Sequence, residues 1–277
     1  MSRKAWINDW CLWGMAVLCN PVMWQHQHTY AHHSHTNDFE NDPDLHHFQR
    51  LLRVHRHFKY EAIHAYQKNP IYVIFSYMLV VFGTCLWIPF NFLKDGSLYG
   101  IVEFTNKNKV LVKVSSLLHF VCYIGIVLVA PFFNVRPVRA AFCGVFQLAI
   151  SGLLFAFFSQ INHLNETSFR KCPDSAPDLS STGKSTFSKS SSWAAKQVES
   201  SNNFATSKLL WHILSNGLNM QIEHHLFPSL NHCHLHLIKQ SVRETCKEYN
   251  VEYKEYESLR CIVQDTLSWL DVLSKPS

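Results

Sequence analysis

Three long apolar segments dominate the hydropathy pattern of the chain. Residues 70–93, 114–133 and 140–161 contain no Asp, Glu, Lys or Arg. Each has about the 20 apolar residues that a helix needs to cross a bilayer. Three such segments are unusual in a soluble protein, so the pattern predicts an all-α integral membrane protein.

The histidine pattern decides which segments cross. Two histidine-rich clusters, at residues 26–35 and 221–236, lie on either side of the apolar segments. An even number of crossings must separate the clusters if they build one site. We assign the crossings to 114–133 and 140–161, joined by a short turn at 134–137 into a helical transmembrane hairpin.

The remaining apolar segment, 70–93, is interrupted by Gly83 and Pro89 and is expected to be re-entrant or interfacial. Crossings at 70–93 and 114–133 instead would carry six charged residues across the membrane: Lys94, Asp95, Glu103, Lys107, Lys109 and Lys113. Our assignment leaves Arg136 and Arg139 on the far side, which runs against the positive-inside tendency.

Two polar features follow from this topology. Residues 173–192 are a Ser-rich run that cannot bury enough apolar surface to order itself, so we expect a flexible loop. The sequon at Asn165 lies just beyond the second crossing and is expected to face the cytosol unmodified.

Residues Ala5–Trp24 are predicted to be helical, and no cleavable signal peptide is visible.

Composition adds a metal hypothesis. The chain has 18 histidines, close to its 20 Asp and Glu residues, and histidine is the commonest metal ligand. A net charge of +5 is too small and scattered for a nucleic-acid binder, whereas it suits a weak preference for an anionic membrane surface. The 9 cysteines form no CxxC pair and are expected to be reduced.

The first cluster lies within the segment 24–45, where His28 and His32 are four residues apart and share a face of a predicted helix, with His33 beside them. The second cluster overlaps the segment 219–228, where Gln221 precedes the pair His224 and His225 by one helical turn.

A third site of the same kind lies between the clusters, where Asn162 and His163 close the second predicted crossing. Imidazole suits iron, and six well-spaced histidines exceed the three or four ligands of a zinc site. The spacing therefore favours two metal ions.

The other histidines receive plainer interpretations. Isolated ones are expected to be packed or hydrogen-bonded: His64, His119 and His212. A second group is expected to be solvated on a basic helix: His46, His47, His55 and His57. A third group lies near the clusters but off the favoured spacing: His26, His35, His232 and His236.

These motifs resemble those of the front-end fatty acid desaturases, which are membrane di-iron enzymes. QHTYAHHSHTN at 27–37, with the following NDPDL, resembles their second histidine box, and NMQIEHHLFP at 219–228 resembles the third, with glutamine replacing the first histidine. The likeness continues through SQINH at 159–163, WAAKQVESSNNF at 193–204 and the tail from His234 to Tyr253.

The resemblance implies two iron ions and a ligand set: His28, His32, His33, His163, His224 and His225, with Gln221 in or beside it. Asn162 and Asn219 would support these ligands. It further implies O2 and a fatty acyl lipid or acyl-CoA as substrates, and cytochrome b5 with its reductase as electron donors. The expected location is the endoplasmic reticulum membrane, multi-pass, with a histidine-rich helical cap facing the cytosol.

The sequence departs from the family pattern in two ways. Family members carry a first box, HDxxH, before the segment that SRKAWINDWCLWGM matches, and many carry a cytochrome b5 domain with an HPGG haem motif; neither motif occurs here. We therefore expect the 277 residues alone to lack two ligands and not to desaturate. The alternatives are a non-catalytic desaturase-like membrane protein and a related di-iron lipid hydroxylase.

Overall fold

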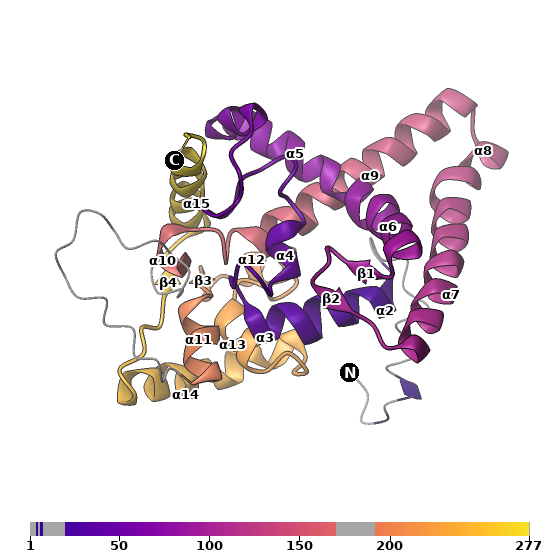
Figure 1. The fold of residues 1–277 in the computed structure, drawn as a ribbon. Helices are drawn as coiled ribbons and strands as arrows, with labels where there is room; N and C mark the ends of the chain where they lie inside the picture. Colours follow the sequence, from indigo (N-terminus) through magenta and orange to yellow (C-terminus); the bar gives the residue numbers. More distant parts are fainter. Residues whose placement is uncertain (1–3, 5, 8–19, 170–191, 277) are drawn as a thin grey trace. The chain divides into compact units, whose positions relative to one another are not determined.

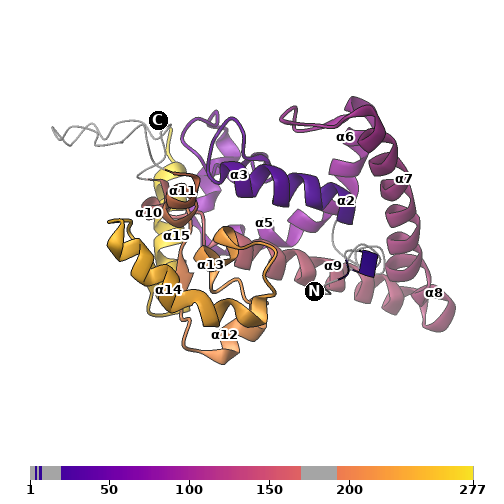
Figure 2. The ribbon, with the colours of Figure 1, turned by 90° about the horizontal axis from the view of Figure 1, so that it is seen from below.

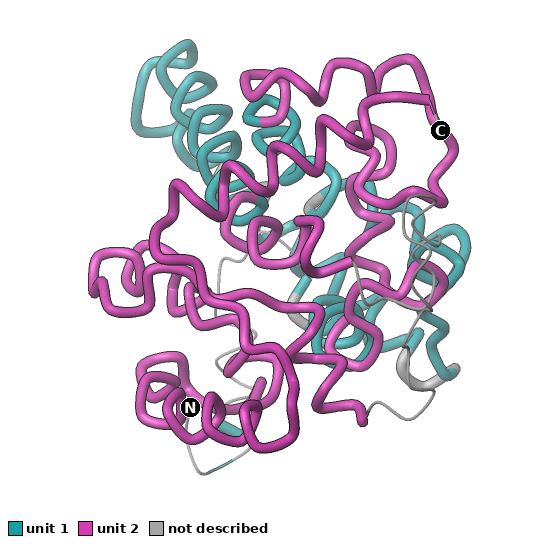
Figure 3. The backbone as a smooth tube through the Cα atoms, turned by 90° about the vertical axis from the view of Figure 1, so that its left-hand side faces the viewer, with its two compact units in different colours: residues 1–31, 74–156 teal, residues 32–73, 157–277 magenta. Residues whose placement is uncertain are grey.

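The computed structural model describes residues 4, 6–7, 20–169 and 192–276 (Figure 1). The chain forms two compact units, one of residues 1–31 and 74–156, the other of residues 32–73 and 157–277 (Figure 3). The predicted Ser-rich loop lies outside the described residues apart from Ser192, and so does most of the predicted helix Ala5–Trp24.

Both units are predominantly helical. The helical elements of unit 1 are α2 (Pro21–Trp24), the π-helix η1 (Gln25–His32), α5 (Pro70–Phe82), the π-helix η3 (Gly83–Trp87), α6 (Ile88–Asp95), α7 (Asn106–Tyr123), the π-helix η4 (Ile124–Val129), α8 (Pro131–Asn134) and α9 (Pro137–Gln160); η1, α5 and α9 continue into unit 2. Those of unit 2 are α3 (His33–His35), α4 (Pro43–His46), the 3₁₀ helix η2 (Ala62–Lys68), α10 (Glu166–Phe169), α11 (Trp193–Glu199), α12 (Leu209–Leu214), α13 (Gln221–Leu226), the 3₁₀ helix η5 (His232–His234), α14 (Leu235–Glu248) and α15 (Leu259–Leu273).

Four two-residue strands among the described residues qualify the all-α prediction. β1 (Ser97–Leu98) pairs antiparallel with β2 (Val102–Glu103) across a turn in which Tyr99 and Gly100 have positive φ. β3 (Asn203–Phe204) pairs in parallel with β4 (Glu255–Tyr256).

The apolar segment 70–93 is helical throughout. Gly83 begins the π-helix η3, and Pro89, which has no N–H to donate, lies in the first turn of α6 directly after η3. Within unit 1, α5 crosses α9 at Gly152, where an added Cβ would lie 2.9 Å from the carbonyl oxygen of Met78. The close approach of the two helices therefore requires glycine.

The predicted hairpin is present as a helix–turn–helix in unit 1. Residues 114–133 fall on α7, η4 and α8, Val135 is extended, and Pro137 starts α9 (Figure 2). Among the described residues, α9 is the one helix long and apolar enough to cross a membrane. Apolar side chains near the turn are exposed, with Phe133 at 84%.

Unit 2 is built around two apolar clusters and a set of buried asparagines. One cluster joins Phe158 and Ile161 to Phe204 and Ile262, and so holds the end of α9 against β3 and α15. Asn202 donates to the Asn162 carbonyl at 2.9 Å, which ties the segment after α9 to the segment before β3.

The histidines outside the predicted boxes divide into two outcomes. His64 is buried and contacts the Gln49 carbonyl oxygen through Nε2 at 3.0 Å, as expected for a packed histidine. The prediction of a solvated helix is wrong for His55, because α4 ends at His46 and His55 is 2% exposed, stacked 5.0 Å from Phe39. Burial, helped by neighbouring cations, lowers the pKa of His55 to about 4.

Candidate metal centre

Five of the six predicted histidines lie together in unit 2. His32 ends η1, His33 opens α3 and His163 follows α9, while α13 carries both His224 and His225. All five are buried. Because η1 and α13 are helical, the predicted one-turn spacings hold, although η1 is a π-helix, a form that is frequent at functional sites.

Three of these histidines converge. One ring nitrogen each from His32, His163 and His225 lies within 4.8 Å of the other two. The His225 and His163 Nε2 atoms are 3.0 Å apart. His33 stacks on His225 with ring centroids 4.3 Å apart, and the His224 ring lies 4.8 Å from that of His33.

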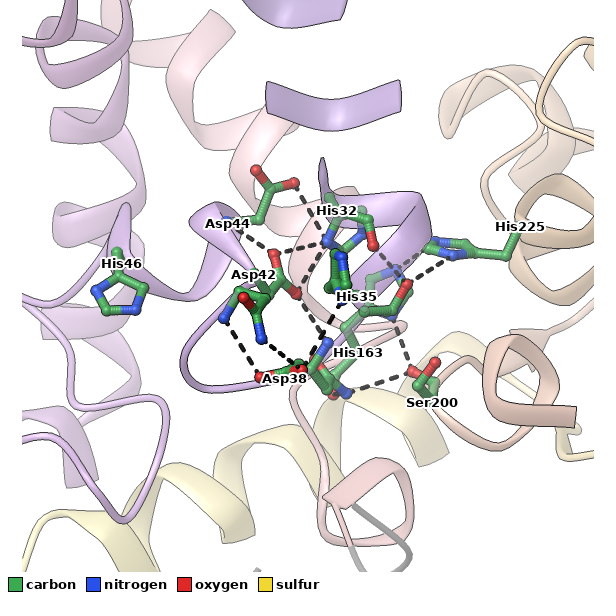
Figure 4. Close-up of polar contacts among 12 residues, drawn as sticks. His32, His35, Asp38, Asp42, Asp44, His46, His163, Ser200 and His225 are labelled. Atoms are coloured by element: carbon green, nitrogen blue, oxygen red, sulfur yellow. Dashed lines mark hydrogen bonds and ion pairs between the residues drawn. The ribbon is translucent and has the colours of Figure 1, made fainter. Parts of the chain in front are cut away.

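Each converging histidine has its Nδ1 beside an acceptor (Figure 4). His32 Nδ1 is 3.0 Å from both carboxylate oxygens of Asp42, and His163 Nδ1 is 3.0 Å from the carbonyl oxygen of Ser200. His225 Nδ1 is 2.9 Å from Gln197 Oε1. Since these oxygens only accept, each Nδ1 carries a proton, and in the neutral form of each ring Nε2 is the basic nitrogen.

This tautomer pattern fits a bound cation. The Nε2 atoms of His163 and His225 lie 3.0 Å apart, and a positive charge beside both would stabilise two basic nitrogens at this spacing. The donor set of buried imidazoles suits a first-row transition metal such as iron.

Gln221 extends the cluster. Its Nε2 donates to His163 Nε2 at 2.9 Å, which agrees with the tautomer assigned to His163. Its Oε1 is buried without a hydrogen-bond partner among the described residues. An amide oxygen in that position can serve as a further oxygen donor to a metal or to a bound water.

His28 belongs to unit 1, where its ring stacks on Trp24 with centroids 4.3 Å apart. Trp24 also packs edge-on against Phe155, at 5.2 Å. In unit 2, His232 lies beside the predicted ligands, with its ring 4.9 Å from that of His224.

The two asparagines predicted to support the ligands contact other groups. Asn162 donates to the Leu218 carbonyl at 2.9 Å, and Asn219 Oδ1 lies 3.1 Å from His212 Nδ1. Asn162 Oδ1 and Asn219 Nδ2 are buried without a hydrogen-bond partner among the described residues.

The charges around the cluster differ from one histidine to the next. Burial opposes the protonation of His32, but Asp42 and Asp44 outweigh it and raise the pKa of His32 to about 9. Burial and four neighbouring histidines hold the pKa of His225 well below its ordinary range. The acidic side of the cluster thus lies at His32 and would offset part of the charge of a bound cation.

Sequence reasoning missed the groups that hold the rings. Asp42 had a readable signal, since an Asp before Pro43 predicts a helix N-cap, and it accepts from the Asp44 backbone at 2.9 Å. Gln197 and Ser200 lie in a stretch that only the family resemblance singled out. A backbone carbonyl such as that of Ser200 leaves no sequence signal.

A comparison with known protein families assigns the chain to one of them. The family model described as "Fatty acid desaturase" matches residues 1–257. The chain belongs to the fatty acid desaturase family. It is 25% identical over 266 residues to the sn-1 linoleoyl-lipid 6-desaturase of Synechocystis, covering 92% of this chain and 67% of that desaturase.

Two further desaturases are similar. The acyl-lipid (8-3)-desaturase of Physcomitrium patens is 33% identical over 87% of this chain, and that of Mortierella alpina is 27% identical over 84%. The chain spans 48% and 49% of the lengths of these two desaturases. No solved structure matches it significantly.

Proposed function

We propose that this protein is a di-iron, O2-dependent front-end desaturase. It would form a cis double bond between an existing double bond and the carboxyl end of a polyunsaturated acyl chain. The observation that carries the proposal is the convergence of buried His32, His163 and His225, each with Nδ1 beside an acceptor. Gln221, in the QxxHH form of the third box, favours front-end chemistry.

The proposed ligands are the residues that the sequence singled out: His28, His32, His33, His163, His224 and His225, with Gln221 beside them. Two iron ions, when bound, supply the activation of O2 and the removal of hydrogen from the acyl chain. The protein's own groups orient the rings through Asp42, Ser200 and Gln197. Their burial keeps bulk water from the cluster.

The proposed setting is the endoplasmic reticulum membrane. The exposed apolar side chains around α8 and the apolar helix α9 are suited to contact with lipid. The relatives are named acyl-lipid desaturases, which favours a lipid-bound acyl chain over acyl-CoA as the substrate. Electrons would come from cytochrome b5 and its reductase.

Lipid analysis tests this function. A yeast strain without polyunsaturated lipids would express the complete coding sequence and be fed linoleate, with His225→Ala as the matched inactive variant. We expect a new double bond on the carboxyl side of those supplied, and none with His225→Ala. A hydroxylated product would show that the enzyme is a lipid hydroxylase and not a desaturase. Unchanged lipids from a membrane-integrated, iron-loaded protein would refute catalysis.

A further inference from the structure

Helix α11 contacts all three histidine segments of unit 2. The Trp193 indole N–H donates to the carbonyl of His33 at 3.2 Å. The Ser200 carbonyl, at the end of the helix, lies 3.0 Å from His163 Nδ1. Gln197, between them, lies 2.9 Å from His225 Nδ1. One short helix thus touches every box that supplies a buried histidine.

Gln197 makes the most specific of these contacts. It is 2% exposed, and its Oε1 accepts from the Thr36 hydroxyl at 3.0 Å as well as from His225. Thr36 in turn lies 2.8 Å from the carbonyl of His32. The single amide oxygen of Gln197 therefore joins the segment that carries His32 to the ring of His225.

The position of Gln197 is set by packing rather than by the histidines. The Ser192 side chain caps the start of α11, accepting from the backbone of Ala195 at 3.3 Å. Val198 packs with Ile222 of α13 in an apolar cluster. Because the helix is fixed from both sides, its acceptor oxygen is in place before any ligand binds, which is what a positioning group requires.

We propose that Gln197 is a positioning residue for the metal centre: by accepting the Nδ1 proton of His225, its side-chain oxygen directs the basic Nε2 toward the metal. This inference rests on the proposed function, in which His225 binds iron. Outer groups of this kind fix the tautomer and the ring orientation of histidine ligands, and their loss typically costs about 10–100-fold in metal affinity.

Two substitutions separate positioning from simple packing. Gln197→Met keeps the bulk of the side chain but replaces the amide oxygen by a thioether, a weak acceptor. Gln197→Glu keeps an acceptor oxygen and adds a charge. If Gln197 is a positioning residue, Gln197→Glu should bind iron at least as tightly as the wild type, and both should bind it more tightly than Gln197→Met. A packing role predicts the reverse, because a buried charge is costly and an apolar isostere is not.

Gln67→Met is the matched control. Gln67 is also a fully buried glutamine of unit 2, but its side chain contacts the Arg53 and Leu270 backbones, away from the histidine cluster. We expect this variant to lower the melting temperature without changing iron affinity per folded chain. Iron retention would be measured on purified, monodisperse protein by competition with a chelator.

The expected result is about a 10–100-fold loss of iron affinity in Gln197→Met and none in Gln197→Glu. Wild-type retention in Gln197→Met, or weaker retention in Gln197→Glu than in Gln197→Met, would overturn the inference. If Gln197→Met does not fold, Gln197→Glu decides alone, since a loss of affinity relative to wild type refutes positioning.

The proposed function and the role of Gln197 can be refuted by different results. Wild-type protein that retains iron but makes no double bonds contradicts desaturation and leaves the affinity order of the Gln197 variants as the test of positioning. Wild-type protein that retains no metal overturns both.

Discussion

Replacing Asp42 by asparagine should weaken both the fold near the second histidine box, at residues 24–45, and the affinity of the site for metal. The two Asp42 oxygens accept from His32 Nδ1 and from the backbone N–H groups of Asn37, at 2.8 Å, and Asp44, at 2.9 Å. Asn37 is itself buried, and it donates to the carbonyl of His163 at 3.2 Å. Asp42 therefore connects the ring of one proposed ligand to the backbone of another.

These contacts give the expected losses of stability and of metal affinity. In Asp42→Asn an NH2 group, which cannot accept a hydrogen bond, replaces one carboxylate oxygen, so one of the two backbone N–H groups loses its partner. Hydrogen bonds to a charged group are worth about 1.5–3 kcal/mol, which is the expected loss of stability. The His32 tautomer also loses its charged acceptor, and we expect about a 10–100-fold loss of metal affinity.

Iron per chain and the melting temperature in detergent would be measured for Asp42→Asn and for Asp38→Asn. Asp38 caps the same loop, accepting from Glu40 N at 3.0 Å, but its contacts are exposed. We expect Asp38→Asn to match the wild type in both measurements. Equal iron retention in the two variants would refute the role assigned to Asp42.

Three further results are expected. Gly152→Ala should destabilise the protein by about 1–3 kcal/mol, because the new Cβ meets the backbone of α5. Gly125→Ala, whose new Cβ has no atom within 4 Å, should be neutral or stabilising, and equal shifts of the melting temperature in the two variants would contradict this. The folded state favours neutral His55, so its contribution to stability is full above pH 6.5 and lost as pH falls toward about 4, and His55→Phe should flatten this part of the unfolding pH profile. A glycosylation acceptor at Asn134 should be modified while the fully buried Asn165 is not, and the reverse pattern of mobility shifts would refute the hairpin topology.

Helical periodicity accounts for most of what the sequence predicted correctly. The four-residue spacing of His28 and His32 and the short spacing of Gln221 and His225 are local properties of helices, and both segments are helical. The π-helical form of η1 was not predicted, because the four-residue spacing of the histidines was interpreted with the α-helical period, and nothing local in the sequence indicates the i to i+5 hydrogen bonds of a π-helix.

Contacts between distant segments account for what the sequence could not predict. His55 was expected in solvent because its neighbours are basic, but Phe39 and Phe169 cover it from other parts of the chain. Nothing local in the sequence distinguishes Gln197 from other polar residues of a short helix, because its contact is with His225 of α13. Its role depends on a partner 28 residues away, which no local pattern encodes.

Metal analysis of the purified protein tests the central claim most directly. The complete protein, prepared from membranes in mild detergent without added metal, would be analysed by mass spectrometry for iron and zinc per chain, with His163→Ala as the comparison. We expect close to two irons per chain in the wild type and a marked loss in His163→Ala, since His163 Nε2 contacts both Gln221 and His225 in the buried cluster. Stoichiometric zinc without iron, or iron unchanged by His163→Ala, would contradict it.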